Sequence, residues 1–435
     1  MKYIKFILMF LMLKNAISSN LLLEEIRYWS SPEYTRVVFD LNHSDVQYEI
    51  IESSNPSQIN IYLKNIKSEI KKGKMGVNDK VIKSIEILPE QNGIRVILEL
   101  LAKTQFKSLF LQKSGEKTNR LIIDCQYAGY KEEFSEKEFA EIKKKKQIIV
   151  IDAGHGGEDP GAISRYKKIQ EKDVVLKVAQ KLKKLINSNN NLKAILTRES
   201  DYFIPLKERT KMACKYQADL FISIHANSTL RNFTAKGTHV YILSPKGASD
   251  EFSRITANIE NASDMMSEIE IEKKEEKNEL LIKTLVDLSQ TNVLNKSYNF
   301  ANALKNEFLE NRDDKEVEIK SANFMVLRSI NTPSILLEIA FLSNLSEEEL
   351  LIDENFQEKV AQSTYNGILN YLELEGKIPV EKIYCSNTVY HIVQKGDTLL
   401  DLAHLYNLSA NVIKKINGLR SKYLYPGQKL LIANP

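Results

Sequence analysis

The chain has 435 residues, roughly three times the ~150 residues of a typical domain, so several domains are expected. Its 43% hydrophobic and 27% charged residues are typical of globular protein and exclude a polytopic membrane protein or a wholly disordered chain. The formal net charge of +4 falls to +1, 58 basic against 57 acidic residues, without Lys2, Lys5 and Lys14. Such near-neutrality gives no electrostatic footprint for nucleic acid or for an anionic membrane.

The N-terminus has the layout of a secretory signal peptide. Lys2 and Lys5 precede an uninterrupted apolar run at 6–13, and a small-residue stretch at 16–18 follows it. The run is shorter than the ~20 residues that span a bilayer, so we expect no stable membrane span. We therefore predict that residues 1–18 direct export. A buried first helix and a retained anchor are the alternatives.

Residues 22–128 are predicted to form an all-β sandwich. Short runs rich in Val, Ile, Leu and Tyr alternate with polar clusters, and a helical period is almost absent. Runs 36–41 and 95–100 share a basic, apolar, acidic, apolar order, and 59–63 and 121–125 follow them at similar intervals. This weak repeat of about sixty residues suggests a sandwich of two similar sheets. Because it contains no catalytic cluster, we interpret the domain as a binding or targeting module.

A charged segment at 129–146 separates this domain from the next. Eleven of the sixteen residues 131–146 are charged, and we find no apolar face among them. The pattern predicts a solvated linker.

Residues 147–375 are predicted to be α/β with a mostly parallel sheet. The continuous apolar run 148–151 is typical of a strand buried on both faces, and it ends in a glycine-rich turn. A helix-period stretch follows, and further strands alternate with helices. The candidates for those strands are 194–196, 220–224, 238–242 and 335–337, and the tail 388–435 has the order strand, helix, helix, strand.

The glycine-rich turn does not fit a dinucleotide-binding loop, because Asp159 stands where the third glycine should be and a histidine lies inside the turn. His155 and His225 each follow the C-terminal end of a predicted strand, the edge at which α/β sites form. Glu171, at the start of the next helix, is placed to be a third metal ligand. Two histidines and a glutamate leave one open position, as in catalytic zinc sites. The alternative for each histidine is a hydrogen-bonded turn residue.

Four motifs stand in order along this domain: Ile151-Asp152-Ala153-Gly154-His155-Gly156-Gly157 with Asp159-Pro160-Gly161; Glu171-Lys172-Asp173; Ser223-Ile224-His225-Ala226-Asn227; and Pro333-Ser334-Ile335-Leu336-Leu337-Glu338 with Phe341-Leu342-Ser343-Asn344. Together they resemble the motifs of zinc-dependent N-acetylmuramoyl-L-alanine amidases. The resemblance implies that one Zn²⁺ is held by His155, Glu171 and His225. It also implies that Glu338 is the catalytic carboxylate; its alternatives are a strand-end surface carboxylate or a partner of Arg328.

The family's reaction is hydrolysis of the amide bond between the lactyl group of N-acetylmuramic acid and the L-alanine of the stem peptide. It implies a periplasmic, wall-associated enzyme that acts in cell-wall remodelling and daughter-cell separation. Two rival functions stay open: a catalytically inactive envelope protein that only binds peptidoglycan, and a zinc peptidase that cuts within the stem peptide. We expect a monomer.

Residues 245–300 are longer than a minimal connection. In regulated cell-division amidases a comparable insertion folds over the site, and one of its glutamates occupies the open zinc position until an activator protein displaces it. The resemblance implies that a glutamate of this insertion occupies the open zinc position here. Glu260 is the first candidate, and the run 268–279 is the second. A solvated helix is the alternative.

The two flanking domains also resemble known modules. The front domain resembles AMIN, and the tail resembles LysM, a peptidoglycan-binding module. The tail's glycan-binding candidates are Gly396, Asp397, Thr398, Asn417 and Gly418.

Overall fold

The computed structural model describes residues 21–54, 57–68, 70, 73–77, 79–113, 118–130, 135–229, 232–244, 247–262, 279–311, 316–328, 332–378, 389–394, 396–406, 410–417, 419, 421 and 423–432. The predicted signal peptide, most of the run 268–279, Cys385 and Gly418 lie outside them. The chain divides into two units, Met1–Leu372 and Glu373–Pro435, and each is described by itself. Within the described ranges, no helix combines the length and apolarity needed to cross a bilayer.

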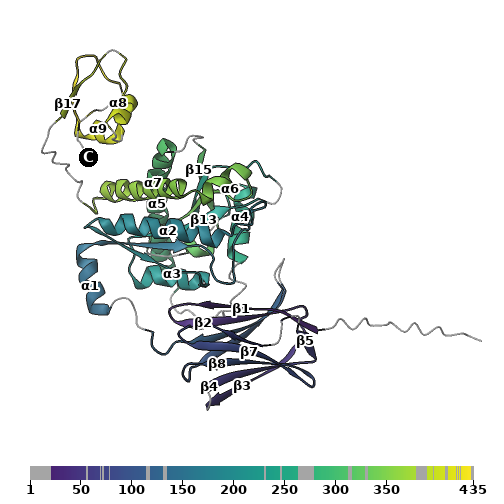
Figure 1. The fold of residues 1–435 in the computed structure, drawn as a ribbon. Coiled ribbons are helices and arrows are strands. Elements are labelled where there is room, and N and C mark those ends of the chain that lie inside the picture. Colours follow the sequence, from purple (N-terminus) through teal and green to yellow (C-terminus); the bar gives the residue numbers. More distant parts are fainter. Residues whose placement is uncertain are drawn as a thin grey trace, which may run out of the picture. The chain divides into compact units, whose positions relative to one another are not determined.

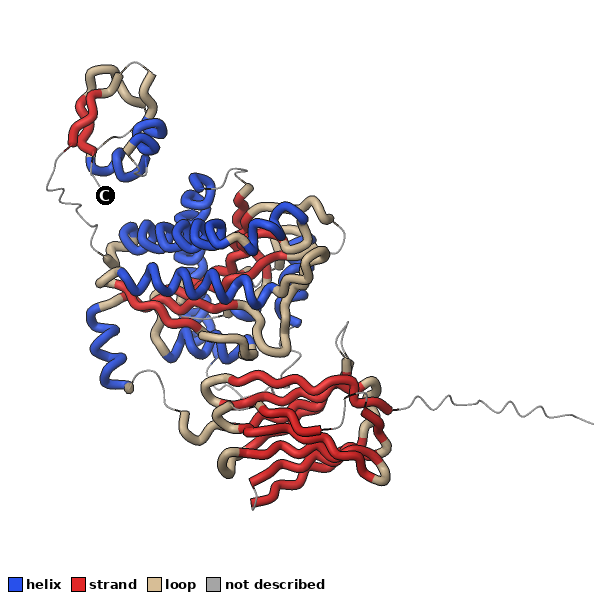
Figure 2. Tube along the Cα trace, in the orientation of Figure 1, coloured by secondary structure: helices blue, strands red, loops and turns tan. Residues whose placement is uncertain are grey.

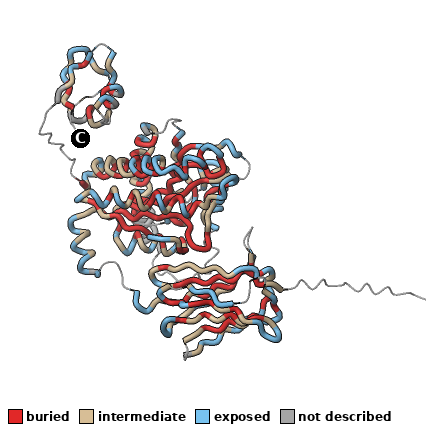
Figure 3. The backbone as a smooth tube through the Cα atoms, in the orientation of Figure 1, coloured by how far each residue is buried: buried red, intermediate tan, exposed pale blue. Residues whose placement is uncertain are grey.

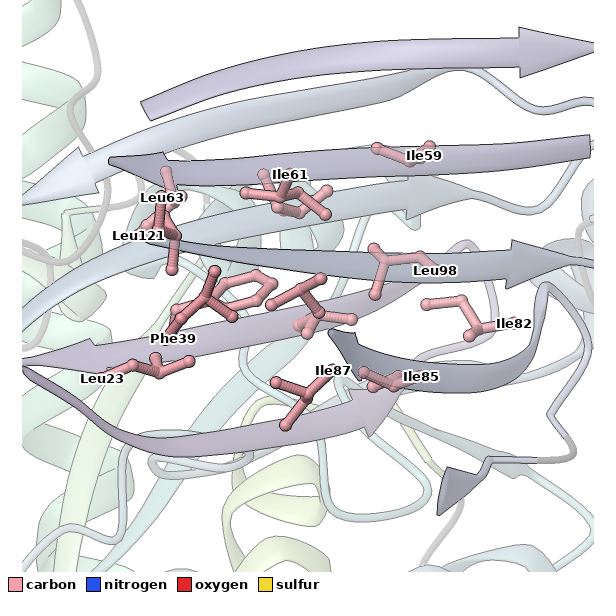
Figure 4. Packing of buried hydrophobic residues seen from close by; sticks show 14 of the residues in the cluster. Leu23, Phe39, Ile59, Ile61, Leu63, Ile82, Ile85, Ile87, Leu98 and Leu121 are labelled. Atoms are coloured by element: carbon pink, nitrogen blue, oxygen red, sulfur yellow. The ribbon is translucent and has the colours of Figure 1, made fainter. Parts of the chain in front are cut away.

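The front domain is a sandwich of two five-stranded sheets, in the orders β5-β1-β2-β10-β9 and β3-β4-β8-β7-β6. Isoleucine, leucine and phenylalanine side chains from both sheets fill the space between them (Figure 4). The strands are β1 (Leu21–Ser30), β2 (Tyr34–Leu41), β3 (Gln47–Ser54), β4 (Ser57–Lys64), β5 (Ile66–Ser68), β6 (Gly73–Gly76), β7 (Ile82–Glu90), β8 (Gly93–Leu100), β9 (Phe106–Leu111) and β10 (Asn119–Gln126).

The weak sequence repeat is divided between the two sheets. Hairpin β1–β2 from the first repeat shares a sheet with β9–β10 from the second, and β7–β8 shares the other sheet with β3–β4. Each sheet therefore contains strands of both repeats. The predicted β-sandwich is confirmed, and its pseudo-symmetry arises from this exchange.

The charged segment predicted as a solvated linker contains a helix, α1 (Glu136–Lys145). Ser135 and Glu138 form a capping box at its N-terminus. Phe139 and Ile142 lie three residues apart and pack against the core of the central domain. The prediction of no apolar face was wrong because two apolar side chains at helical spacing are enough to dock a short helix.

The central domain is built on a six-stranded sheet in the order β12-β11-β13-β16-β14-β15. All neighbouring pairs are parallel except β14–β16, so the mostly parallel sheet is confirmed. Every residue of β13 and β16 is buried, and helices cover both faces of the sheet (Figures 1 to 3). The elements are β11 (Gln147–Ala153), α2 (Glu171–Ser188), β12 (Leu192–Leu196), α3 (Leu206–Lys215), β13 (Leu220–Asn227), β14 (Thr238–Leu243), α4 (Glu251–Asn261), α5 (Glu279–Asn311), β15 (Val317–Ala322), the 3-10 turn η2 (Met325–Leu327), β16 (Ser334–Phe341), α6 (Leu345–Ile352) and α7 (Glu354–Leu374).

The second unit has the predicted βααβ order: β17 (Val389–Ile392), α8 (Leu399–Leu405), α9 (Ala410–Ile416) and β18 (Lys429–Ile432). Strands β17 and β18 pair antiparallel. Its small core is formed by Val393, Leu399, Leu402, Ala403, Ile413, Leu430 and Ile432.

The two cysteines that the structure describes differ in exposure. Cys125 is buried in β10, and burial raises the pKa of its thiol to about 12. Cys214 is exposed on α3. Because the thiolate is the reactive form, a thiol reagent at pH 8 should modify Cys214 in the native protein and leave Cys125 unmodified until it unfolds. Peptide mass spectrometry checks this, and rapid native labelling of Cys125 would contradict it.

Candidate metal centre

His155 follows β11 in a backbone conformation that is rare for a residue with a side chain. Its φ is +59°, and the next two residues, Gly156 and Gly157, also have positive φ. Glycines leave room for the imidazoles. A Cβ on Gly154 would lie 2.4 Å from the His225 ring, and one on Gly161 would lie 2.6 Å from both the His155 ring and a Glu171 carboxylate oxygen. The glycine-rich turn therefore shapes a side-chain site rather than a phosphate cradle.

Four buried side chains converge here: His155, Glu171, His225 and Glu260. One ligand atom from each lies within 4.8 Å of the others. His155 Nε2 is 3.1 Å from Glu171 Oε2, and His225 Nδ1 is 3.0 Å from Glu171 Oε1. Two imidazoles and two carboxylates at these distances suit a divalent cation such as Zn²⁺. The structure thus brings together the three ligands proposed from the sequence and, as a fourth possible ligand and second carboxylate, the insertion glutamate Glu260.

Three further side chains, to which sequence reasoning gave no role, hold the loop that carries His155. The Asp159 carboxylate lies 2.8 Å from His155 Nδ1, which leaves Nε2 for the site. Arg209 donates to the His155 carbonyl at 2.7 Å. Arg198, fully buried, donates to the carbonyls of Ala153 and Gly154. The sequence offers little to identify the two arginines, because no local pattern separates an arginine that will be buried from one that will be exposed.

The site is buried and rich in carboxylates. Burial alone lowers the pKa of His225, but Glu260 and Glu171 overcome it and raise that pKa to about 10. Burial likewise opposes the charged form of His155, and Glu171 with Asp159 raises its pKa well above the usual range. Surroundings that stabilise a proton on each imidazole also favour a bound divalent cation, which competes with those protons.

Glu338 lies on β16 beside this cluster. In register it faces His225 on one neighbouring strand and His239 on the other, so its side chain shares their face of the sheet. Glu338 is 0% exposed, and neither of its carboxylate oxygens has a hydrogen-bond partner among the described residues. Burial raises its pKa well above the usual range. The alternative of a surface carboxylate was therefore wrong. Arg328, the other alternative partner, donates to Asn323.

Glu260 extends into the cluster from the last turn of α4. Its Oε2 lies 3.0 Å from His225 Nδ1 and 3.2 Å from His155 Nε2. Asn261, the next residue, fixes this end of the helix by bonds to the Asn323 carbonyl and the Met325 amide, both at 2.8 Å. Glu260, the first glutamate predicted for the insertion, therefore lies within reach of both histidines.

The tail candidates have partners inside their own domain. Asp397 pairs with His391 at 2.8 Å, and Thr398 caps α8 through Asp401. The Asn417 side chain accepts from the Leu431 amide and donates to its carbonyl. Gly396 adopts φ +105°, and a Cβ added there would meet no described atom within 4 Å. These contacts give Asp397, Thr398 and Asn417 a structural task in the module.

The chain is similar to proteins of a known family. A family model described as N-acetylmuramoyl-L-alanine amidase matches residues 149–370, which is 222 of 435 residues. The chain belongs to the N-acetylmuramoyl-L-alanine amidase family. Two further family models match this amidase: AMIN domain over residues 25–125 and LysM domain over residues 391–433.

Two related amidases each match 80% of this chain. The amidase is 31% identical to the N-acetylmuramoyl-L-alanine amidase AmiC of Escherichia coli O6:H1, over 80% of this chain and 88% of that protein. It is 30% identical to AmiC of Neisseria meningitidis serogroup B, over 80% and 89% of the two chains. Among solved structures, AmiC2 of Nostoc punctiforme is 26% identical, with a TM-score of 0.39, over 52% of this chain and 97% of that one.

Proposed function

We propose that the protein is a Zn²⁺-dependent amidase that hydrolyses the bond between the N-acetylmuramic acid lactyl group and the L-alanine of the stem peptide. The observation that carries this proposal is the convergence of His155, Glu171 and His225 beside the buried Glu338. Membership of the amidase family supports the proposal that this particular amide bond is hydrolysed. An exported, periplasmic enzyme of cell-wall remodelling and daughter-cell separation follows from the substrate.

The ligand set fits zinc. The His155 Nε2 is buried and makes no hydrogen bond to a described residue, although two carboxylates lie within 3.2 Å. Its Nδ1 is held by Asp159, the arrangement that orients a metal-ligating histidine. When bound, Zn²⁺ supplies a Lewis acid that acidifies a water molecule, polarises the amide carbonyl and favours the ionised form of Glu338.

Glu338 is the group placed to move the proton. No described residue hydrogen-bonds its carboxylate oxygens, so both are available to a water molecule. As general base it accepts the proton of the attacking water, and as general acid it delivers that proton to the leaving nitrogen of L-alanine. Its burial excludes bulk water, which would otherwise compete for this transfer.

Glu260 gives the site a built-in inhibitor. A carboxylate held 3.0 to 3.2 Å from both imidazoles occupies the position that water and substrate need. Helix α4, which carries it, is anchored in the central core by Ala257. Release therefore requires α4 to move, and an activator protein that binds the helix could supply the energy. The run 268–279 stays a second candidate.

The decisive experiment is mass spectrometry of purified sacculi digested by the enzyme. An amidase releases intact stem peptides that begin with L-alanine, whereas a peptidase within the stem releases shorter fragments. An inactive binding protein releases neither. Fragments cut inside the stem would replace this proposal by the peptidase alternative.

Metal removal is expected to abolish the release. Chelation of the wild-type enzyme and the substitution His155→Ala should each remove the metal and the activity, because either change breaks the ligand set. Elemental analysis measures the metal, and Zn²⁺ added back should restore only the chelated wild type. Full activity of the metal-free enzyme would contradict a zinc mechanism.

A further inference from the structure

Strand β2 of the front sandwich is buried on both faces, whereas its counterpart in the sequence repeat is not. Every residue from 35 to 41 is buried, including Val38, which lies on the face opposite the sandwich core. In β8, buried and half-buried residues alternate, and Ile97, the repeat equivalent of Val38, is half-buried. Alternation is typical of a sheet with one solvated face. The outer face of the β1-β2-β10-β9 sheet is therefore covered at β2 and β10.

Phe203, from the loop between β12 and α3 of the central domain, lies against that face. It is 2% exposed and forms an apolar cluster with Val38, Leu111 and Ile122. The Tyr34 hydroxyl donates to the Phe203 carbonyl at 2.8 Å. These contacts lie within the single unit Met1–Leu372. The sandwich thus packs on the central domain through a defined apolar anchor.

A buried ion pair joins the two domains beside this anchor. Arg36 Nη1 lies 2.7 Å from Glu158 Oε1, and the Glu158 side chain is 0% exposed. Arg120 lies 3.7 Å from the other Glu158 oxygen. Arg36 also donates two hydrogen bonds of 2.7 Å, from Nε and Nη2, to the Asp124 carboxylate. A buried carboxylate of the central domain therefore depends on arginines of the front domain for its counter-charge.

Glu158 belongs to the His155 loop, which we define as residues 154–161. Its neighbour Asp159 holds His155 Nδ1 at 2.8 Å. A Cβ on Gly157 would lie 2.7 Å from the Phe203 amide, so the apolar anchor touches the same loop. Lys172 connects this loop with the front domain. Its Nζ donates a hydrogen bond to the Gly157 carbonyl at 2.8 Å and lies 5.7 Å from the centre of the Trp29 ring.

We propose that the front sandwich is docked on the His155 loop through Arg36 and Glu158, and that this contact holds the loop in its ligand-presenting form. Glu158 is then a positioning residue that acts through Asp159, and the front domain is part of the active-site support as well as a targeting module. The docking stands on the contacts alone. Its effect on metal retention rests on the proposed zinc site.

Full-length variants test both parts. Arg36→Gln, Glu158→Gln and the double variant remove the pair, and Arg95→Gln, at the repeat position of Arg36, is the matched control. Hydrogen exchange at residues 155–159 should become faster in each single variant, and the double variant should add little, because both substitutions break one contact. Arg95→Gln should leave this exchange unchanged.

Zinc retention against a chelator is the second measurement. Each single variant should bind Zn²⁺ with roughly 10-fold lower affinity, the lower end of the range for loss of a ligand's own hydrogen-bond partner, because the Asp159 bond to His155 is weakened and not removed. Tyr34→Phe, which removes only the bond to Phe203, gives a milder variant with the same direction of effect if Arg36→Gln fails to fold.

The outcomes separate the claims. Unchanged exchange at 155–159 in folded Arg36→Gln, or fully additive effects in the double variant, would overturn the docking. Faster exchange with wild-type zinc retention would overturn the positioning role. A wild-type enzyme that binds no zinc would overturn the proposed function and the metal effect, while the exchange data would still decide the docking.

Discussion

Glu338→Gln should reduce amidase activity by about 10²- to 10⁴-fold, the contribution of a positioned general acid and base. The amide keeps the shape of the side chain but cannot accept the water proton. Zinc content should stay at the wild-type level, because Glu338 is outside the His155, Glu171, His225 and Glu260 cluster. Activity is measured as stem-peptide release from sacculi, and zinc by elemental analysis.

The same variant should not be less stable than wild type at pH 7. Burial raises the pKa of Glu338 in the folded protein. The folded state therefore binds a proton more tightly than the unfolded state, and the carboxyl lowers stability as pH rises above its unfolded pKa. An uncharged amide removes this cost. A large loss of thermal stability would mean that the activity loss reflects unfolding.

Glu307→Gln is the matched control for this substitution. Glu307 is also buried, accepts a bond from Asn370 at 2.6 Å, and has a pKa raised by burial. It lies on α5, outside the metal cluster. Its substitution should leave turnover unchanged. Retained turnover in Glu338→Gln would refute the proposed proton transfer and leave the site without a base.

Glu260→Ala should raise basal activity in the absence of any activator. Removal of the carboxylate that lies 3.0 Å from His225 Nδ1 opens the position that substrate needs. A minor open state is commonly populated at about 0.1–10%, so an unblocked site should gain ~10-fold or more in turnover. Initial rates on sacculi measure the gain.

Glu251→Ala, at the start of the same helix, is its control. Glu251 is exposed and pairs with Arg254 within α4, so its loss leaves the site untouched. Its basal rate should match wild type. Equal rates for Glu260→Ala and wild type, with zinc bound in both, would show that Glu260 does not block the site. Deletion of 254–290 is a less specific test, because it also removes Ala257 from the core.

Local sequence identified most of the candidate site. His155, Glu171 and His225 lie at or near the ends of a strand or helix, so they could be found from short-range patterns. Glu338 lies inside the buried strand β16 and was indicated only by the family resemblance. The helix in the charged segment was missed, because Phe139 and Ile142 acquire an apolar partner only in the folded domain. Strand β15 was missed for a related reason. Its sequence, Val317 to Ala322, alternates without a strong apolar run.

The sequence by itself determined the three-domain order, the α/β class and the identity of the metal-ligand candidates, because each depends on periodicity, turns or motifs within a few residues. Only the tertiary structure decided which distant groups support them. Asp159 and Arg209 hold His155, Glu260 reaches the ligands from α4, and Arg36 meets Glu158 across 122 positions of the chain. Buried charges find their partners only when the fold brings separate segments together, since no local pattern specifies a contact between them.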